Sequence, residues 1–278
     1  GMYFDGLRLQ RLVKIGGYKL SIQAVLRVIF SNYFMAMLTP GASGGAVAQV
    51  LVLKSYGVPI SKGTPIVLIR TVFSIMFLVI MLPLVFLRDA IEIPYISRDM
   101  LLLFAVLAVI ATLLGTYILQ TKYMRQFVYN LAQRFKAHKT KDWLSKLETL
   151  NQGLGLLYKE PIQSIIVFFE SGLSLLCLYC IAPALMYAFT PDIPIIDILD
   201  RMILLNLILY FAPTPGGTGI AEGLFVVLFS AFVPNGTVGI VAVAWRVVAE
   251  YLPFFIGMYA VLTLYGRQFV AQETSREQ

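Results

Sequence analysis

Long apolar blocks, separated by short polar stretches, most constrain how this chain can fold. Hydrophobic residues make up 59% of its 278 residues and charged residues only 13%, against roughly 25% charged residues in soluble domains. Several blocks approach or exceed the ~20 apolar residues that cross a bilayer as a helix. They lack the alternation typical of membrane β-barrel strands. We therefore predict an all-α polytopic membrane protein with apolar segments at about 21–38, 65–87, 100–119, 161–189, 198–212 and 237–265.

Two glycine-rich stretches interrupt these apolar blocks. The first is Thr39-Pro40-Gly41-Ala42-Ser43-Gly44-Gly45, and the second is Thr214-Pro215-Gly216-Gly217-Thr218-Gly219. Proline and clustered glycines do not continue a regular helix at low cost. At membrane depth, broken backbone survives only where protein or a wet cavity covers it. A short apolar helix is expected after each stretch, at about 46–56 and 220–232, so we interpret them as the tips of two re-entrant helical hairpins.

The distribution of charge predicts how these segments face the membrane. Residues 121–160 carry eight lysines and arginines against three acids, and the start of the chain is also basic. The loops at 88–99 and 190–197 are biased toward acids. Because positive charge favours the cytoplasmic side, both termini and residues 121–160 are expected there. The two hairpins must then enter from opposite faces. We expect the cell membrane of a bacterium as the location.

This reasoning divides the chain into five parts. We expect a basic interfacial N-terminus (1–20), a first membrane repeat with its tip at 39–45 (21–120), and a basic cytoplasmic amphipathic linker (121–160). A second repeat with its tip at 213–219 (161–265) and a polar, disordered tail (266–278) follow. A solvated connector is the alternative for the linker.

The two membrane parts share an order of residues. Asn32, Thr39-Pro40-Gly41, Gln49 and Arg70 occur in the same sequence as Asn206, Thr214-Pro215-Gly216, Glu222 and Arg246. Two halves of similar pattern and opposite orientation form an inverted-topology repeat, and interrupted helices in matching positions indicate a binding site. Chance similarity between glycine-rich apolar stretches is the alternative.

Arg246 is the charge that most needs an explanation. It lies about ten residues inside an apolar block, where an unpaired charge costs at least ~2.5–3.5 kcal/mol. Glu222 and Glu250 are its candidate partners. One interpretation is a structural ion pair that locks the second hairpin to the last apolar segment. The other is that Arg246 and Arg70 offer a cationic station for a phosphate headgroup, although Arg70 could also snorkel to the interface.

The hairpin tips add backbone donors to this site. The short helices after the tips direct free N–H groups and positive dipole ends at the midplane, which favours an anion. Ser43 and Thr218 are placed as N-caps, and the glycines could simply permit close packing. Glu170 is either a partner for an intramembrane arginine or a proton-coupling carboxylate. The candidate substrate-binding set is Arg70, Arg246, Glu222, Gln49, Thr39, Gly41, Ser43, Gly44, Gly45, Thr214, Gly216, Gly217, Thr218, Gly219, Glu250 and Glu170.

The sequence lacks the residues that several kinds of chemistry require. The only cysteines are Cys177 and Cys180, and the only histidine is His138. A zinc site or a histidine-based triad is therefore not expected, and no phosphate-binding Gly-x-x-x-x-Gly-Lys-Ser/Thr loop occurs. We expect no metal, no cofactor, no nucleic acid and no catalytic residue.

The second tip resembles a known family signature. Pro215-Gly216-Gly217-Thr218-Gly219-Ile220-Ala221-Glu222 is similar to the Pro-Gly-Gly-x-Gly-x-x-Glu motif of the lysylphosphatidylglycerol synthase transmembrane family. This family includes the flippase domain of the multiple-peptide-resistance factor. The first tip with Gln49, and Arg246 with Tyr251 and Gly257, are also similar to family patterns. The resemblance covers about residues 7–265, and no soluble synthase domain is expected after Gly266.

The resemblance implies a membrane flippase fold that moves aminoacylated or related lipids between leaflets. Ala46 departs from the polar residue that relatives often carry there. We expect a translocase for an anionic or aminoacylated phospholipid, or for a polyprenyl-phosphate-linked lipid, with the bilayer as its surroundings. A homodimer is an open alternative to a monomer. An intramembrane lipid-modifying transferase and a non-transporting membrane subunit are the other functions considered.

Overall fold

The protein is mainly helical in the part that its computed structural model describes, which is residues 1–88, 98–118, 155, 160–234 and 236–276. The first half contains α1 (Met2–Ile15), α2 (Ile22–Leu38), α3 (Ser43–Ser55), α4 (Ile60–Leu87) and α5 (Arg98–Ile118). The second half contains α8 (Pro161–Tyr179), α9 (Ile181–Met186), α10 (Ile195–Leu209), α11 (Ile220–Phe229), α12 (Val238–Arg246) and α13 (Leu252–Arg276). Most of the linker predicted at 121–160 lies outside the described residues.

Three described helical stretches are long and apolar enough to cross a membrane. They are Ile60–Leu87, Pro161–Met186 and Val238–Leu264. The prediction of an all-α membrane protein is confirmed by this composition and by the helical fold. α3 and α11 are shorter, with 13 and 10 residues, and at 1.5 Å per residue they extend only about 20 and 15 Å.

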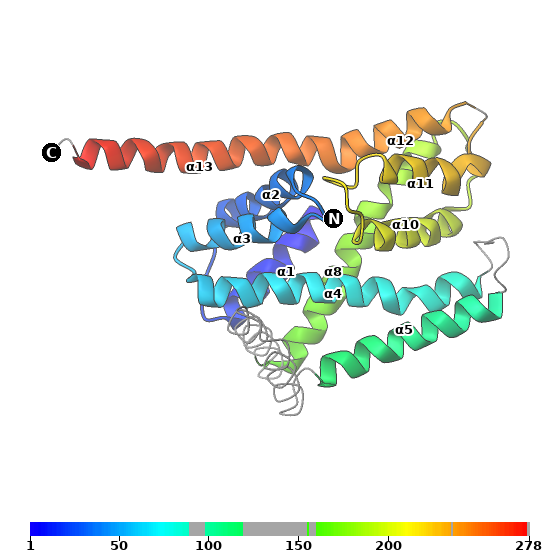
Figure 1. Cartoon of the computed structure of the whole chain (residues 1–278), viewed down its shortest axis with the longest axis horizontal. Coiled ribbons are helices and arrows are strands. Elements are labelled where there is room, and N and C mark those ends of the chain that lie inside the picture. The colour runs from blue at the N-terminus through cyan, green and yellow to red at the C-terminus, as the bar shows by residue number, and fades with distance from the viewer. Residues whose placement is uncertain (89–97, 119–154, 156–159, 235, 277–278) are drawn as a thin grey trace, which may run out of the picture.

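The two halves contain helices in the same order, and corresponding helices pack against the opposite half. α2 packs along α13, whereas its counterpart α10 packs along α4, and α1 packs against α8. In Figure 1, α4 runs from left to right while α12 and α13 run from right to left. The α2–α3 and α10–α11 hairpins lie toward opposite ends of the bundle, with their tips at its centre (Figure 1).

Each half has its own apolar core. In the first half, Leu9 and Leu12 of α1 pack with residues of α2, α3 and α4. In the second half, Phe225 of α11 stacks on Trp245 and also packs against Phe229. α1, which we expected to be an interfacial helix, therefore buries one face in the core. Its pattern of Leu9, Leu12 and Val13 places apolar side chains on one side of a helix.

Prolines explain two departures from the expected segments. The block at 161–189 divides after Tyr179, because Pro183 has no N–H to offer the Tyr179 carbonyl. The last apolar block contains a π-helical turn, Val247–Tyr251, just before Pro253, which likewise offers no N–H to Ala249. The tail after Gly266, expected to be disordered, instead continues α13 to Arg276. No proline occurs in that stretch, and most of its residues tolerate a helix.

Candidate functional site

The first tip is a tight connection between α2 and α3. The Thr39 hydroxyl donates to the Met35 carbonyl and accepts from the Gly44 amide, both at 2.8 Å. Gly41 and Ala42 have φ of 60° and 52°, which is the left-handed region that glycine tolerates and alanine seldom adopts. A β-carbon on Gly45 would lie 2.4 Å from Asn32 Oδ1. Glycine at position 45 therefore permits close packing, as one of our two interpretations held.

The second tip connects α10 to α11 through three left-handed glycines. Gly216, Gly217 and Gly219 have φ of 58°, 68° and 82°. The Gly219 amide donates to Glu222 Oε2 at 2.7 Å, so the carboxylate caps the first turn of α11. The Thr214 hydroxyl is buried and lacks a partner among the described residues. The second tip therefore depends on glycine for its backbone and on Glu222 for its cap.

Ser43 and Thr218 are not N-caps, contrary to the prediction. The N-caps are Ala42 and Gly219. The Ser43 hydroxyl donates to the Pro40 carbonyl at 3.0 Å, and the Thr218 hydroxyl donates to the Pro215 carbonyl at 2.9 Å. Each of these proline carbonyls also accepts from the backbone amide of the same residue, Ser43 or Thr218, so one residue closes each turn with two donors. The two tips therefore share the same hydrogen bond from a hydroxyl to the proline carbonyl three residues earlier.

The tips contact each other. Pro40 and Pro215 form an isolated antiparallel backbone bridge. A β-carbon on Gly216 would lie 2.7 Å from Met37 Sδ, so the second tip packs directly on the end of α2. The structure therefore joins the two glycine-rich stretches, which are far apart in the sequence, at the centre of the bundle.

Arg246 braces the second tip. Its Nε donates to Glu222 Oε1 at 2.8 Å and its Nη2 to the Gly216 carbonyl at 2.9 Å. Its Nη1 donates to Glu250, one helical turn further on. The side chain is only 1% exposed. Both candidate carboxylates thus contact Arg246, and the guanidinium ties α12 to the tip and to α11.

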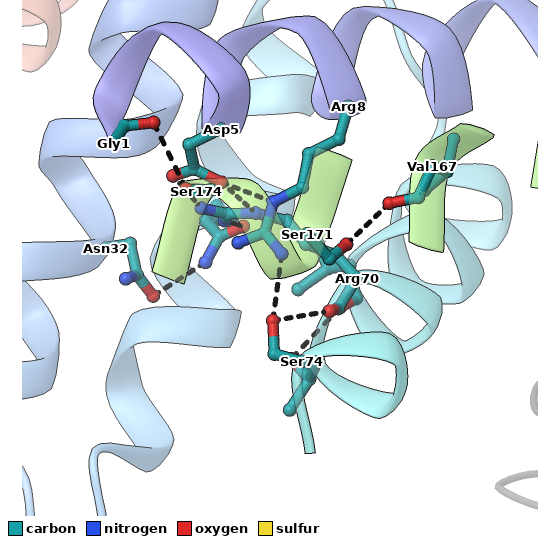
Figure 2. Close-up of polar contacts among 12 residues, drawn as sticks. Gly1, Asp5, Arg8, Asn32, Arg70, Ser74, Val167, Ser171 and Ser174 are labelled. Atoms are coloured by element: carbon teal, nitrogen blue, oxygen red, sulfur yellow. Dashed lines mark hydrogen bonds and ion pairs between the residues drawn. The ribbon is translucent and has the colours of Figure 1, made fainter. Parts of the chain in front are cut away.

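Arg70 occupies the matching position in the first half but has different partners. Its guanidinium binds both carboxylate oxygens of Asp5 and the side-chain oxygen of Gln49. Gln49 in turn donates to Asn32 Oδ1 at 2.6 Å. Figure 2 shows Asp5, Arg8, Arg70 and Asn32 converging from three helices. This series of hydrogen bonds from Arg70 through Gln49 to Asn32 links α4, α3 and α2. Gln49 therefore has the bridging position that Glu222 has in the second half.

Asp5 and Arg8 are site residues that the sequence reasoning missed. Both are buried, and Asp5 Oδ1 accepts from Arg8 Nε at 2.5 Å and from Arg70 Nε at 3.0 Å. Arg8 Nη1 also donates to the Ser74 hydroxyl at 2.8 Å (Figure 2). The available signal was an acid and a base three residues apart on one face of a helix. The segment carries four basic residues, at positions 8, 11, 14 and 19, and this basic composition favoured an interfacial helix.

Glu170 has the arginine partner that one of its two interpretations required. Arg11 Nη2 lies 2.7 Å from Glu170 Oε1, and Arg11 Nη1 donates to Gln163 at 2.7 Å. The pair joins α1 to α8 away from the tips. The structure therefore pairs Glu170 with Arg11 rather than with Arg70 or Arg246.

A cavity of about 410 Å³ lies between the halves, beneath the two tips. Of the predicted site residues, those that line it are Gly41, Ser43, Gln49, Arg70, Gly216, Gly217 and Glu250. Asp5 and Arg8 also line it. The remaining predicted residues do not line it: Thr39, Gly44, Gly45, Thr214, Thr218, Gly219, Glu222, Arg246 and Glu170. All of these except Glu170 shape or brace the tips instead. The cavity thus combines a mainly apolar lining with a few charged and polar groups, and its size is typical of small-molecule sites.

Comparisons with known proteins agree with this architecture. The family model described as the lysylphosphatidylglycerol synthase TM region matches residues 1–257. A UPF0104 membrane protein of Archaeoglobus fulgidus is 21% identical over 263 residues, covering 92% of this chain and 80% of that protein. No solved structure gives a significant match. Because the family model spans most of the sequence, the chain belongs to the family of lysylphosphatidylglycerol synthase transmembrane regions.

Proposed function

We propose that the protein is a lipid translocase, or flippase, whose substrate headgroup passes through the cavity beneath the two tips. The observation that carries this proposal is the charged chamber at the junction of the two halves, lined by Arg70, Asp5 and both tips. A charged chamber within an apolar bundle suits a polar headgroup whose acyl chains stay in lipid. The family to which the chain belongs is often linked to flippase function.

The exchanged packing of the two halves supports a transport mechanism. In transporters built from inverted repeats, the substrate site lies at the repeat interface, and one half moves against the other around it. Here the α2–α3 and α10–α11 hairpins lie toward opposite ends of the bundle and meet at Pro40 and Pro215. A small relative shift of the hairpins would open the chamber first to one end and then to the other.

We infer that both hairpins are re-entrant. α3 and α11 extend about 20 and 15 Å, which is less than the ~30 Å hydrocarbon core. Each could therefore reach the midplane and return, but not cross. The broken backbone at Pro40 and Pro215 would then sit at mid-depth, where the opposite tip and the cavity cover it.

The proposed surroundings follow from the charge pattern. The basic stretches at 3–19 and 121–160 favour the cytoplasmic side of a bacterial cell membrane. Both termini would lie there. The substrate class we propose is a phospholipid with an anionic or aminoacylated headgroup, or a polyprenyl-phosphate-linked lipid.

Reconstitution in liposomes tests the function directly. Vesicles of phosphatidylcholine would carry a few per cent of a headgroup-labelled phosphatidylglycerol, and a membrane-impermeant reductant would report how much label each leaflet holds. We expect the protein to make the inner-leaflet label accessible faster than in empty vesicles. A rate equal to that of empty vesicles, for anionic, aminoacylated and polyprenyl-phosphate probes alike, would contradict transport and favour a non-transporting subunit. Chemical change of the probe on thin-layer chromatography would indicate a transferase.

A further inference from the structure

Tyr179 lines the cavity with a buried side chain. The residue ends α8 and is 1% exposed. It lines the cavity together with Arg8 and Arg70. Its hydroxyl is buried and lacks a hydrogen-bond partner among the described residues. Buried polar groups without a partner are rare and costly, so the hydroxyl is a donor that a ligand entering the cavity can satisfy.

The first-half side of the cavity carries an excess of positive charge, while Glu250 lines the cavity from the second half. Arg8 and Arg70 share the single carboxylate of Asp5, so the three side chains together carry one net positive charge. Arg8 uses its Nε for Asp5 and its Nη1 for Ser74, which leaves donors from the five N–H groups of a guanidinium. Asp5 orients both guanidinium groups and Ser74 orients that of Arg8 before any ligand arrives, which lowers the entropy lost on binding.

The second half does not offer an equivalent site. Arg246 does not line the cavity, and its donors are directed to Glu222, Glu250 and the Gly216 carbonyl. Its positive charge is more than balanced by two carboxylates. An anion that enters the cavity therefore meets its complementary charge in the first half and not at Arg246.

We propose that Arg8, Arg70 and the Tyr179 hydroxyl form a binding site for a phosphate ester monoanion. The carboxylate of Asp5 limits the net positive charge of this site to one. A phosphate ester offers oxygens that accept from both guanidinium groups and from the hydroxyl at once. The identification of this ester as the headgroup of a transported lipid rests on the proposed function. The site itself would bind a free phosphate ester by the same contacts.

Binding can be measured on the full chain in detergent micelles. The probes are glycerol phosphate, dihexanoylphosphatidylglycerol and, as the uncharged control, dihexanoylglycerol. Trp245, which also lines the cavity, supplies a fluorescence signal, and the ligand-dependent rise in melting temperature supplies a second. We expect the phosphate probes to bind and the uncharged lipid to give no saturable signal. Binding of both lipids but not glycerol phosphate, with equal affinity, would contradict an anion site.

Tyr179→Phe is the most informative variant, because it removes only the unpartnered hydroxyl. We expect the melting temperature without ligand to stay unchanged or rise, and the affinity for the phosphate probes to fall about tenfold, as one lost hydrogen bond to a charged group implies. Tyr187→Phe makes the same change on an exposed side chain outside the cavity and should bind as the unmodified protein does. Asp5→Asn should tighten binding, and Arg8→Gln should weaken it.

Three outcomes separate this inference from the proposed function. If Tyr179→Phe and Arg8→Gln bind the phosphate probes with unchanged affinity while vesicle transport continues, the site is wrong and the function stands. If both variants lose affinity but the unmodified protein moves no lipid, the proposed binding site is supported and the proposed transport function is contradicted. If glycerol phosphate binds as tightly as the lipid, the site stands as one for phosphate esters in general, and competition by glycerol phosphate in the vesicle assay would show whether transport uses it.

Discussion

Pro40 and Pro215 pair in an antiparallel backbone bridge that joins the tips of the two hairpins. Proline has no N–H and two carbonyls cannot hydrogen-bond each other, so Pro40 and Pro215 form no hydrogen bond between themselves. The bridge therefore lacks the direct hydrogen bonds of a regular ladder pair, which suits the tip opening proposed above. Because the cavity lies directly beneath it and includes Gly41 and Gly216, separation of these two residues would change access to Arg70.

Cross-linking the tips should stop transport reversibly. The free thiols Cys177 and Cys180 are first changed to serine, and Pro40→Cys and Pro215→Cys are then introduced. Opposed residues in an antiparallel pair lie about 4.5–5.5 Å apart at Cα, which suits a disulfide. Mild oxidation should give the disulfide and abolish translocation in liposomes, and reductant should restore it. Each single cysteine variant is the control, and full transport by the oxidised double variant would contradict tip opening.

Replacing Arg246 should destabilise the fold before it affects any binding step. Arg246→Gln leaves Glu222 and Glu250, whose side chains are 29% and 21% exposed, without their cation, so the loss should be smaller than the about 3–5 kcal/mol of a fully buried pair. Unfolding monitored by tryptophan fluorescence should show this loss. The triple change Arg246→Gln, Glu222→Gln and Glu250→Gln removes the charges together and should recover part of it. Unchanged stability with lost transport would instead favour Arg246 as a cationic headgroup station.

The order of helices and the two tips were predictable because their signals are local. Apolar length, proline and glycine marked the ends of α2 and α10 within a few residues, and charge bias indicated that the hairpins point in opposite directions. The Arg246 partners followed from helical spacing, since Glu250 is one turn away. These features depend on few neighbours in sequence.

The first-half site was less predictable because it depends on tertiary contacts. Asp5 and Arg8 lie on a short helix whose basic flanks resemble an interfacial segment, and only the packing of α1 against α4 and α8 buries them. Hydrophobic patterning does not show which buried arginine faces a cavity and which is enclosed by carboxylates. Arg70 and Arg246 look equivalent in the sequence, and their surroundings differ only once α1 is in place.

The Arg11–Glu170 pair offers a test of proton coupling. Glu170→Gln should lower the free energy of unfolding by about 1 kcal/mol, since Arg11 is 30% exposed and the pair is partly solvated. The exchange Arg11→Glu with Glu170→Arg should recover stability if the pair only joins α1 to α8. We expect transport by Glu170→Gln to respond to an imposed pH gradient as the unmodified protein does. Loss of that response alone would indicate that Glu170 carries protons.

Gly257 should be among the least replaceable positions in the last helix. A β-carbon there would lie 2.1 Å from the Phe30 carbonyl oxygen, so Gly257→Ala must push α13 away from α2. Lipid gives helices no hydrophobic drive to associate, and the association depends on such close approach. We expect a loss of about 1–3 kcal/mol in unfolding experiments. Gly239→Ala in α12 is the matched control, because nothing lies within 4 Å of its β-carbon, and it should be neutral or stabilise by up to about 1 kcal/mol. Equal effects of the two changes would show that α2 and α13 are not in contact at Gly257.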